Sequence, residues 1–483
     1  MSKRETLNLI SVEDLLNRND EVVRKIREIN DQYYREQARQ KKAIIVTYGC
    51  QMNEHDSEKL DAMLQEMGYL TVKKLDQADL IIFNTCCVRE NAELKVYGNL
   101  GRIKHLKTKN KDLVLAVCGC MMQQPHIVEE IKKKYKFVDL VFGTHNLHNF
   151  PTLLEETLSG GRQVVEVWDS EGDVIEGLKA NRKMDVKAFV NIMYGCDNFC
   201  AYCIVPYTRG RERSREASDI IEEIEMLVSR GVREITLLGQ NVNSYGKTLS
   251  EPIDFADLLK MVNEIKGVER IRFMTSHPKD ISDKLLVTMA ACEHVCEYLH
   301  LPVQAGSNKI LKAMNRHYTR EQYLATVKRA KELMPGLSIS TDIIVGFPGE
   351  SKEDFEETLS LMREVGYDSA FTFIYSKRTG TPAAELENQV SEEEKHRRMT
   401  ELLEMFNPMV KEKIKSYQDQ ILEVLVESTS KSSDSVLMGR SRQHVTVNFE
   451  GDKDLIGKLV KVKATEPKSF SIFGEITEVE QDI

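Results

Sequence analysis

The stretch from residue 194 to residue 203 reads Tyr-Gly-Cys-Asp-Asn-Phe-Cys-Ala-Tyr-Cys. It places the thiols of Cys196, Cys200 and Cys203 in one loop, with three and then two residues between them. Short, fixed gaps between cysteines are typical of iron–sulfur sites, because several thiolates must meet around one cube of iron and sulfide. Three thiolates leave one iron of a four-iron cube open, much as a catalytic zinc keeps a position for water or substrate. The pattern therefore predicts a cluster whose open iron binds a small molecule.

Two other interpretations of these cysteines are weaker. A structural zinc site normally has four ligands in paired Cys-x-x-Cys groups, and no fourth ligand of that kind lies nearby in the sequence. Packing in an apolar core is disfavoured because the loop contains Gly195, Asp197 and Asn198, which are turn-forming residues.

The composition indicates a soluble protein of about three domains, on the usual scale of 100 to 200 residues per domain. Of the 483 residues, 41% are hydrophobic and 30% are charged, and no run of about 18 apolar residues predicts a membrane span. The amino-terminal residues lack the apolar core of a signal peptide, which predicts a cytoplasmic protein. Cytosolic thiols are kept reduced, so the ten cysteines indicate metal or redox chemistry. The net charge of -9 argues against a surface that is basic throughout but allows a local basic patch.

The amino-terminal part predicts a helical arm followed by a parallel sheet. Residues 1–41 are rich in charge and in helix formers. In residues 42–160, short apolar runs alternate with amphipathic stretches, which is the pattern of an open parallel sheet covered by helices. We predict strands at Ala43–Thr47, Leu80–Asn84, Leu113–Val117 and Asp139–Phe142.

Cysteines follow three of these strands: Cys50 the first, Cys86 the second and Cys120 the third. In an open parallel sheet the carboxyl ends of the strands lie on one edge, where ligands bind. The sequence therefore predicts a second three-thiol site, which the fold assembles from distant parts of the chain.

Four other residues lie close to this second set. We interpret Cys87 and Cys118 as small buried cysteines or as neighbours of the ligands, because cysteine is among the most buried residue types. Asn53 and Asn84 either orient the site or cap helices.

The central part predicts an open, partial barrel. Residues 161–181 are interpreted as a linker, and in residues 182–414 strand and helix alternate six times, which favours a (β/α)6 arrangement over a closed barrel of eight. We predict strands at Ala188–Met193, Glu234–Leu238, Arg270–Met274, Tyr298–Val303, Ser338–Val345 and Ala370–Tyr375, and helices at Ser218–Ser229, Phe255–Ile265, Lys352–Val365 and Glu392–Tyr417.

Polar residues and glycines follow the predicted barrel strands, where the chemistry of such barrels is carried. The cysteine loop follows the first strand, and the next four are followed by Gly239-Gln240-Asn241, His277-Pro278, Gln304-Ala305-Gly306 and Gly346-Phe347-Pro348-Gly349-Glu350. Each group alone is compatible with ordinary turn chemistry. Together they predict one polar mouth. Cys292 and Cys296, four apart on a predicted helix, would share a face and are interpreted as structural cysteines rather than a two-thiol metal site.

The carboxyl-terminal residues 415–483 predict a small all-β barrel of the kind that binds oligonucleotides. Its five predicted strands are Ile421–Glu427, Ser435–Met438, His444–Phe449, Leu459–Thr465 and Ser471–Val479. Arg440, Arg442 and Phe449 offer charge for phosphate and an aromatic ring for stacking. Acidic residues outnumber basic ones here, so nonspecific RNA binding should be weak, and a dimerisation or capping barrel is the alternative.

A run of arginines just after the cysteine loop is a second candidate for RNA contact. It contains Arg209, Arg211 and Arg213. A charge run is usually a solvated face, but this one adjoins the predicted catalytic mouth.

The cysteine loop resembles the signature of the radical S-adenosylmethionine enzymes, which have an aromatic residue, here Tyr202, before the third cysteine. The resemblance implies that S-adenosylmethionine chelates the open iron and that an electron from the cluster cleaves it to methionine and a 5'-deoxyadenosyl radical. It further implies a contact between Gly239, Gln240, Asn241 and the methionine amino group, although the usual Gly-Gly-Glu is absent. Ile344 and Gly346 resemble the segment beside the adenine, and Gln304 is a further candidate contact.

The resemblance narrows to the methylthiotransferases through Tyr48-Gly-Cys-Gln-Met-Asn53, Asn84-Thr-Cys-Cys-Val-Arg89 and Cys118-Gly-Cys-Met-Met-Gln123. In that family one cysteine of each motif holds an auxiliary 4Fe-4S cluster, and the matching positions are Cys50, Cys86 and Cys120. The chain is thus expected to bind two 4Fe-4S clusters. Its carboxyl-terminal barrel resembles the TRAM domain, an RNA-binding module.

Within the family, the motifs most resemble the branch that acts on isopentenyladenosine beside the anticodon of tRNA. The implied reaction replaces the hydrogen on carbon 2 of the adenine with a methylthio group, and two S-adenosylmethionine molecules supply the methyl group and the radical. The implied partners are the tRNA anticodon stem-loop, a low-potential electron donor of the flavodoxin or ferredoxin type and a sulfur source. We expect a monomer.

The sequence is compatible with three alternatives. Two lie inside the family: methylthiolation of threonylcarbamoyladenosine in tRNA, or of an aspartate on a ribosomal protein. The third is a non-catalytic iron–sulfur RNA-binding sensor, which would bind clusters and RNA without turning over S-adenosylmethionine.

Overall fold

The computed structural model describes residues 12–87, 90–168, 180–181, 186–430 and 433–479. They belong to two units. The first unit contains the residues up to 183 together with Ile204–Arg211, and the second contains residues 184–203 and those from 212 onward. Among the described helices, none combines the length and the apolar composition that a membrane crossing requires.

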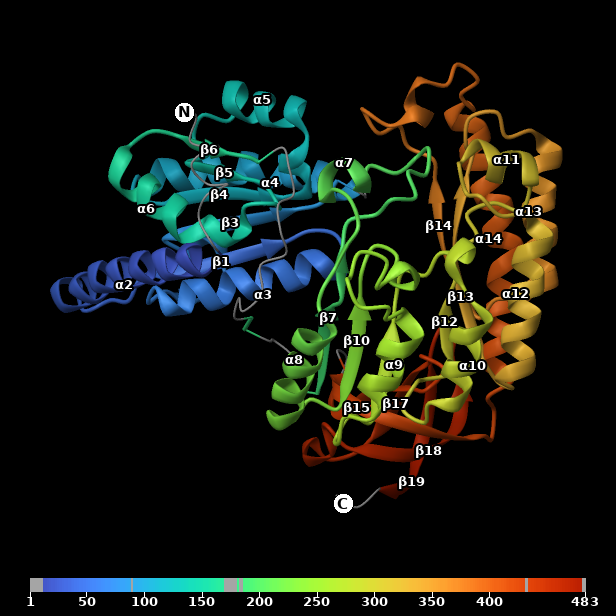
Figure 1. Cartoon of the computed structure of the whole chain (residues 1–483). Helices are drawn as coiled ribbons and strands as arrows, with labels where there is room; N and C mark the ends of the chain where they lie inside the picture. Colours follow the sequence, from blue (N-terminus) through green and yellow to red (C-terminus); the bar gives the residue numbers. More distant parts are fainter. Residues whose placement is uncertain (1–11, 88–89, 169–179, 182–185, 431–432, 480–483) are drawn as a thin grey trace. The chain divides into compact units, whose positions relative to one another are not determined.

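The first unit is built on a six-stranded parallel sheet with strand order β2-β1-β3-β4-β5-β6 (Figure 1). Its strands are β1 (Lys42–Thr47), β2 (Leu70–Thr71), β3 (Leu80–Thr85), β4 (Val114–Gly119), β5 (Leu140–Phe142) and β6 (Val164–Glu166). Four of them confirm the predicted strands. The short strands β2 and β6 were not predicted, because two or three residues show no periodicity, and β6 lies in the segment interpreted as a linker. Residues 169–179 of that segment lie outside the described residues.

Helices cover both faces of this sheet, as the alternation along β3 requires. Leu80 and Ile82 face a cluster with residues of three helices, whereas Ile81 and Phe83 face the opposite cluster. The first cluster involves α2 (Val12–Gln37), α3 (Gln51–Glu66) and α6 (Phe150–Gly160), and the second involves α4 (Glu90–Lys109) and α5 (Pro125–Lys134).

The predicted amino-terminal helix is α2, and it is part of the folded unit rather than a free arm. Ile26 is fully buried in the cluster with α3 and α6. The Asn30 amide donates a hydrogen bond to the Met67 carbonyl at 2.8 Å, and Asn19 donates to the His148 carbonyl at the same distance. Residues 1–11 lie outside the described residues.

Two glycines shape the edge at which β1 and β4 end. Gly49 has φ of +112° and Gly119 has φ of +95°, a region that residues with a Cβ rarely adopt. A Cβ on Gly49 would lie 2.2 Å from the Cβ of Cys86, and one on Gly119 would lie 2.4 Å from the carbonyl oxygen of Thr85. The residue before Cys50 and the residue before Cys120 must therefore be glycines for these strand ends to approach each other.

The second unit contains the six predicted barrel strands, arranged as two three-stranded parallel sheets, β11-β10-β7 and β12-β13-β14. A parallel bridge between Ile271 and Val295 lies between the two sheets, which confirms an open, partial barrel. The strands are β7 (Lys187–Asn191), β10 (Glu234–Leu238), β11 (Arg270–Phe273), β12 (Tyr298–His300), β13 (Ser338–Val345) and β14 (Ser369–Ile374).

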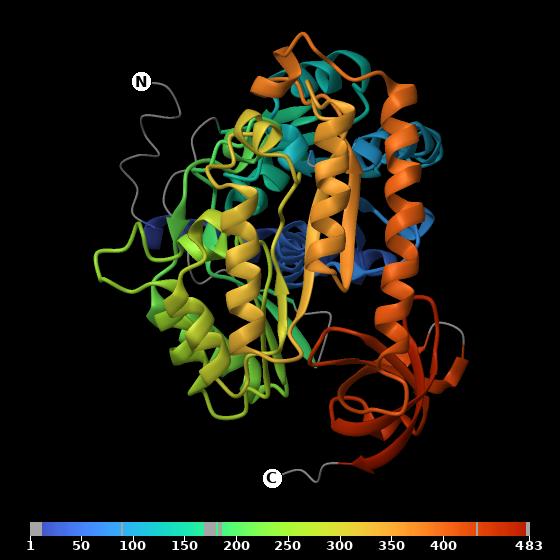
Figure 2. The same cartoon turned by 90° about the vertical axis from the view of Figure 1, so that its right-hand side faces the viewer.

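Helices pack on the outside of this barrel. Those that follow its strands are α8 (Ala217–Ser229), α9 (Phe255–Asn263), α10 (Asp283–Ala291), α11 (Asn308–Ala313), α12 (Arg320–Leu333), α13 (Lys352–Val365) and α14 (Glu392–Lys415). In Figure 2, α12, α13 and α14 stand side by side in front of the β12-β13-β14 sheet, and α14 leads into the last domain.

The carboxyl-terminal domain is the predicted small β barrel, and it is closed, with strand order β15-β16-β17-β19-β18. Its strands are β15 (Ile421–Ser430), β16 (Ser433–Ser441), β17 (Thr446–Glu450), β18 (Leu459–Pro467) and β19 (Ile472–Val479). It packs on the amino-terminal ends of the partial-barrel strands. Arg270, fully buried at the start of β11, donates to the Arg440 carbonyl at 2.6 Å and to the Glu423 carboxylate at 2.8 Å. The opposite ends of the strands therefore remain available for the site.

We predict that Gly119→Ala lowers the free energy of unfolding of the first unit by roughly 3 kcal/mol, because the new Cβ meets rigid backbone and the φ is strained. Gly101→Ala is the matched control, since Gly101 lies in α4 with open space around it, and it should stabilise by about 0.5–1 kcal/mol. Fluorescence of Trp168, the sole tryptophan, reports denaturant unfolding of this unit. Equal midpoints for Gly119→Ala and the unmodified protein would contradict the prediction.

Candidate functional site

The three cysteines predicted at the sheet edge of the first unit do lie at the ends of neighbouring strands. Cys50 is the residue before α3, Cys86 directly follows β3, and Cys120 directly follows β4. The strand order reverses its direction between the adjacent strands β1 and β3. Ligands of open parallel sheets bind at the carboxyl ends of the strands at such a reversal.

The amide of Asn53 connects these strand ends. Its Oδ1 atom accepts hydrogen bonds from the thiols of Cys50 at 3.6 Å and Cys120 at 3.7 Å. Its Nδ2 atom donates to the carbonyl of Thr85, the residue before Cys86, at 2.8 Å. The Asn84 amide in turn donates to the Asn53 carbonyl at 2.8 Å. Both asparagines therefore orient the site, and neither caps α3, whose N-cap is Cys50.

A buried arginine contacts the same group of atoms. Arg209 ends α7 (Val205–Arg209), a short helix that belongs to the first unit. Its Nε donates to the Cys120 sulfur at 3.0 Å, and its Nη2 donates to Asn53 Oδ1 at 3.0 Å and to Asp56 Oδ2 at 2.8 Å. Arg209 is only 7% exposed, so its guanidinium is engaged within the unit rather than open to an RNA phosphate.

The surroundings lower the pKa of two of the three cysteines, so their thiols, which donate to Asn53 Oδ1 while protonated, lose the proton more readily. A hydrogen bond from Cys86, together with nearby Arg209, lowers the pKa of Cys50 to about 6. A hydrogen bond from Cys87, again with Arg209, lowers the pKa of Cys120. The thiolate is the form that binds metal.

The two additional cysteines of this region differ in their surroundings. Cys87 is a neighbour of the set. Its hydrogen bond to Cys120 raises its pKa well above the ordinary value, and burial raises it further. Its thiol also lies 3.7 Å from Thr208 Oγ1. Cys118 packs in the core cluster that contains residues of α2, α3 and α6, and burial raises its pKa. This matches the interpretation of both as neighbours or core residues.

The donor set of this edge fits an iron–sulfur cluster. Its thiols are free rather than paired in disulfides, and thiolates are the ligands that hold iron and sulfide. Across the described residues, no three or more His, Cys, Asp and Glu side chains are arranged to hold a single metal ion.

The cysteine loop of the second unit follows β7 and is held in place at several points. Strand β8 (Met193–Tyr194), where the loop begins, pairs antiparallel with β9 (Arg213–Ser214). The Asn315 amide donates to the Phe199 carbonyl at 3.0 Å, and the Ala201 amide donates to the Met314 carbonyl at 2.9 Å. Cys200 is buried, whereas Cys196 and Cys203 are partly exposed. Burial raises the pKa of Cys196 to about 11.

A second buried arginine contacts this loop. The Nη1 atom of Arg316 donates to the Cys200 sulfur at 3.4 Å, and its Nη2 atom donates to the Pro302 carbonyl at 2.8 Å. Nothing in the sequence around Arg316 distinguished it from a surface cation, so its position was not predicted.

Buried polar atoms that lack hydrogen-bond partners gather at the carboxyl ends of the barrel strands. Among the described residues they include both amide atoms of Asn191, which ends β7, Asn241 Oδ1 after β10, and Ser276 Oγ and His277 Nε2 after β11. A buried polar atom without a partner costs about 1–3 kcal/mol, so these atoms offer hydrogen bonds to water or to a bound polar molecule. The predicted polar mouth is therefore suited to a ligand such as S-adenosylmethionine.

The other residues predicted to contact that ligand also lie at strand ends. Gly239, Gln240 and Asn241 follow β10. Gln304 bridges to β13, where the Ile344 amide donates to its carbonyl at 2.9 Å. The Gly346 amide donates to Glu350 Oε2 at 2.8 Å, and Arg398 binds the same carboxylate at 2.7 Å. The loop after β13 is thereby fixed to α14.

The predicted RNA contacts of the small barrel have partners inside the second unit. Phe449 is fully buried in the barrel core, so its ring offers no face to a base. Arg442 binds the Glu297 carboxylate at 2.7 Å, and Arg440 contacts His444 at 2.8 Å. Arg211 is exposed and Arg213 half-buried.

The prediction that Cys292 and Cys296 share a helix face is wrong. Helix α10 ends at Ala291, Cys292 has extended backbone, and Cys296 lies in the segment before β12. Both are buried, which agrees with their interpretation as structural cysteines.

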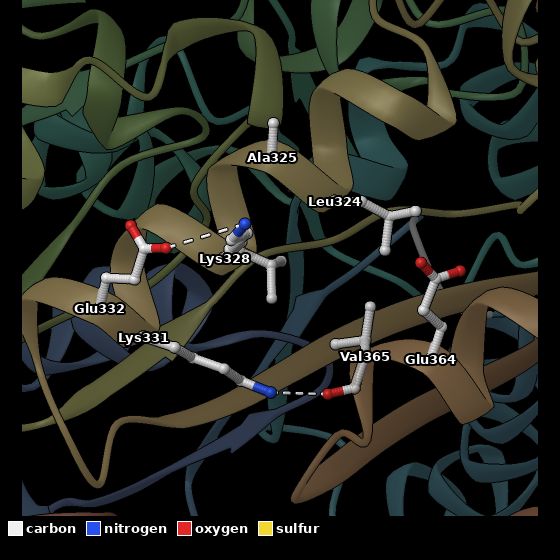
Figure 3. Close-up of a pocket in the computed structure, with 8 residues that line it drawn as sticks. Leu324, Ala325, Lys328, Lys331, Glu332, Glu364 and Val365 are labelled. Carbon is white, nitrogen blue, oxygen red and sulfur yellow. Dashed lines mark hydrogen bonds and ion pairs between the residues drawn. The ribbon is translucent and has the colours of Figure 1, made fainter.

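The second unit has a hollow of about 560 Å³ that is lined by residues of its outer helices (Figure 3). It lies between α12 and α13, where Lys331 donates to the Val365 carbonyl at 2.6 Å. Its walls come from the outer helices rather than from strand carboxyl ends, so it belongs to neither candidate site.

Family comparisons cover the three predicted parts of the chain. The Radical SAM superfamily matches residues 190–362, the uncharacterized protein family UPF0004 matches residues 42–143, and the TRAM domain matches residues 415–477. The fold is similar to that of the radical S-adenosylmethionine methyltransferase TsrM from Kitasatospora setae, solved with cobalamin and a 4Fe-4S cluster. That similarity has a TM-score of 0.52 at 14% identity, over 71% of this chain and 77% of the other.

Two relatives match nearly the whole chain. It is 58% identical over 475 residues to the tRNA-2-methylthio-N(6)-dimethylallyladenosine synthase of Clostridioides difficile (strain 630), which covers 98% of this chain and 99% of the relative. It is 61% identical over 436 residues to the protein of the same name from Alkaliphilus oremlandii (strain OhILAs), over 90% of this chain and 93% of the relative. The chain therefore belongs to the tRNA-2-methylthio-N(6)-dimethylallyladenosine synthase family of radical S-adenosylmethionine enzymes.

Proposed function

We propose that this radical S-adenosylmethionine methylthiotransferase uses two separate three-thiol sites. Cys196, Cys200 and Cys203 would hold the 4Fe-4S cluster that binds S-adenosylmethionine. Cys50, Cys86 and Cys120 would hold an auxiliary 4Fe-4S cluster. The observation that carries the proposal is the pair of thiols, on Cys50 and Cys120, that share the Oδ1 atom of Asn53.

The substrate proposed for this chain is tRNA that carries isopentenyladenosine beside the anticodon, and the product has a methylthio group on carbon 2 of that adenine. An unactivated aromatic C–H bond explains the need for a radical, because no ordinary side-chain base removes that proton. When bound, the first cluster supplies the electron that cleaves S-adenosylmethionine, and the auxiliary cluster carries the sulfur. The radical and the sulfur must therefore reach the same carbon atom.

The residues of the chain would hold and orient these groups. The polar atoms of Asn191, Asn241 and His277 would bind S-adenosylmethionine. The His277 Nδ1 atom accepts a hydrogen bond from the backbone amide of Lys279 at 3.2 Å. Burial holds the pKa of His277 well below its ordinary value, and the positive charge of nearby Arg316 lowers it further. Its neutral imidazole thus carries the proton on Nε2 and acts as a donor.

We propose that the enzyme works with two partners besides tRNA. A low-potential donor of the flavodoxin or ferredoxin type supplies electrons, a separate source restores the sulfur, and the enzyme works as a monomer in the cytoplasm. Arg211 and Arg213 are the candidates that we retain for contact with the tRNA backbone. Arg442, which binds Glu297 of the partial barrel, would instead support the packing of the small barrel on it, and Arg440 contacts His444 within the small barrel.

We predict that Cys200→Ala abolishes the reductive cleavage of S-adenosylmethionine, because two thiolates cannot hold the cluster that performs it. The measurement is 5'-deoxyadenosine formed with dithionite, and Cys296→Ala, a buried cysteine outside both sites, is the control. Appreciable 5'-deoxyadenosine from the Cys200→Ala protein would refute the assignment.

We predict that Cys86→Ala retains some 5'-deoxyadenosine formation but yields no methylthio-isopentenyladenosine, because the first site is intact and the sulfur-carrying site is not. Nucleosides from tRNA are measured by mass spectrometry after anaerobic incubation. The neighbouring Cys87→Ala is the control and should retain product. If the Cys86→Ala protein made product and the Cys87→Ala protein made none, Cys87 rather than Cys86 would be the cluster ligand.

A further inference from the structure

Helix α7 brings a cation to the thiol edge of the first unit from a distant part of the sequence. Arg209 and Cys120 are separated by 89 positions, yet Arg209 Nε lies 3.0 Å from the Cys120 sulfur. The same short helix places Thr208 Oγ1 3.7 Å from the Cys87 thiol, and Thr144 donates to the Thr208 carbonyl at 3.1 Å. Several contacts therefore hold the end of α7 at this edge.

The guanidinium of Arg209 is oriented by two other side chains. Its Nη2 atom donates to Asp56 Oδ2 at 2.8 Å and to Asn53 Oδ1 at 3.0 Å. Arginine presents its donors in a rigid planar fork, so fixing Nη2 also fixes the direction of Nε. The Nε–H bond is thereby aimed at the Cys120 sulfur, and the exposed fractions of the Arg209 and Asp56 side chains are only 8% each.

We propose that Arg209 is a positioning residue for the auxiliary cluster, whose Nε–H hydrogen bond to the Cys120 sulfur raises the reduction potential of that cluster. The inference rests on the proposed function, since it takes Cys120 as a ligand. Hydrogen bonds to the sulfurs and the local charge set the potential of an iron–sulfur cluster. A donor that carries positive charge favours the reduced form, which holds one more electron.

Two simpler roles would leave the potential unchanged. In one of them Arg209 only neutralises Asp56, and in the other it only holds α7 on the unit. In either case a variant that removes both charges, Arg209→Gln with Asp56→Asn, would restore the fold and the potential together. In our proposal that double variant restores the fold but keeps a lowered potential, because glutamine does not reproduce the Nε–H donor.

The test uses the full chain with Cys196, Cys200 and Cys203 replaced by alanine, so that the auxiliary cluster is the one observed. After anaerobic reconstitution, a dithionite titration with redox mediators gives the midpoint potential from the EPR signal of the reduced cluster. The variants are Arg209→Gln, Arg209→Lys and the double variant. Arg39→Gln is the matched control, because Arg39 also binds an aspartate of the first unit, Asp79 at 2.7 Å, but contacts no thiol in the bonds that the structure shows.

We expect a more negative potential in Arg209→Gln and in the double variant, a smaller shift in Arg209→Lys, and none in Arg39→Gln. An unchanged potential in the double variant, with the cluster present, would overturn the inference. Absence of any cluster in the triple-alanine protein with Arg209 intact would instead refute the proposed auxiliary site, so the two failures are distinguishable.

Discussion

The meeting of parallel strands at their carboxyl ends is the constraint on which both candidate sites depend. In the first unit, β1, β3 and β4 carry Cys50, Cys86 and Cys120 to one edge, although long helices separate them in sequence. In the second unit the same geometry places the cysteine loop after β7 and gathers buried polar atoms at the ends of the neighbouring strands. Strand direction thus decides where the candidate sites lie, and in the second unit the small barrel packs on the opposite ends of the strands.

Each thiol set is completed by a buried arginine. Arg209 donates to the Cys120 sulfur and Arg316 donates to the Cys200 sulfur, and both side chains have further acceptors that fix their orientation. Burying a guanidinium is costly unless its donors are satisfied. A thiolate is likewise costly to bury alone. A guanidinium beside it balances the charge within each unit and directs N–H groups at the sulfur.

The sequence predicted the strands that show clear periodicity and the cysteines that follow them, because both signals are local. The helix expected at Cys292 and Cys296 ended earlier, since Cys292 takes extended backbone at the end of α10. The partners of Arg209 could not be predicted, because a buried and a solvated arginine look the same in a charge run. The same holds for Phe449, whose ring lies in the barrel core rather than at the surface. Long-range packing decided each of these cases.

The measurement that tests the account most directly is the iron and acid-labile sulfide content of the anaerobically reconstituted chain and of two triple-alanine variants, one for each thiol set. The account predicts that each variant loses about four irons per chain and keeps the other cluster, because the sites are built on separate units. Loss of all iron from either variant, or of none from the variant at Cys50, Cys86 and Cys120, would contradict two independent three-thiol sites.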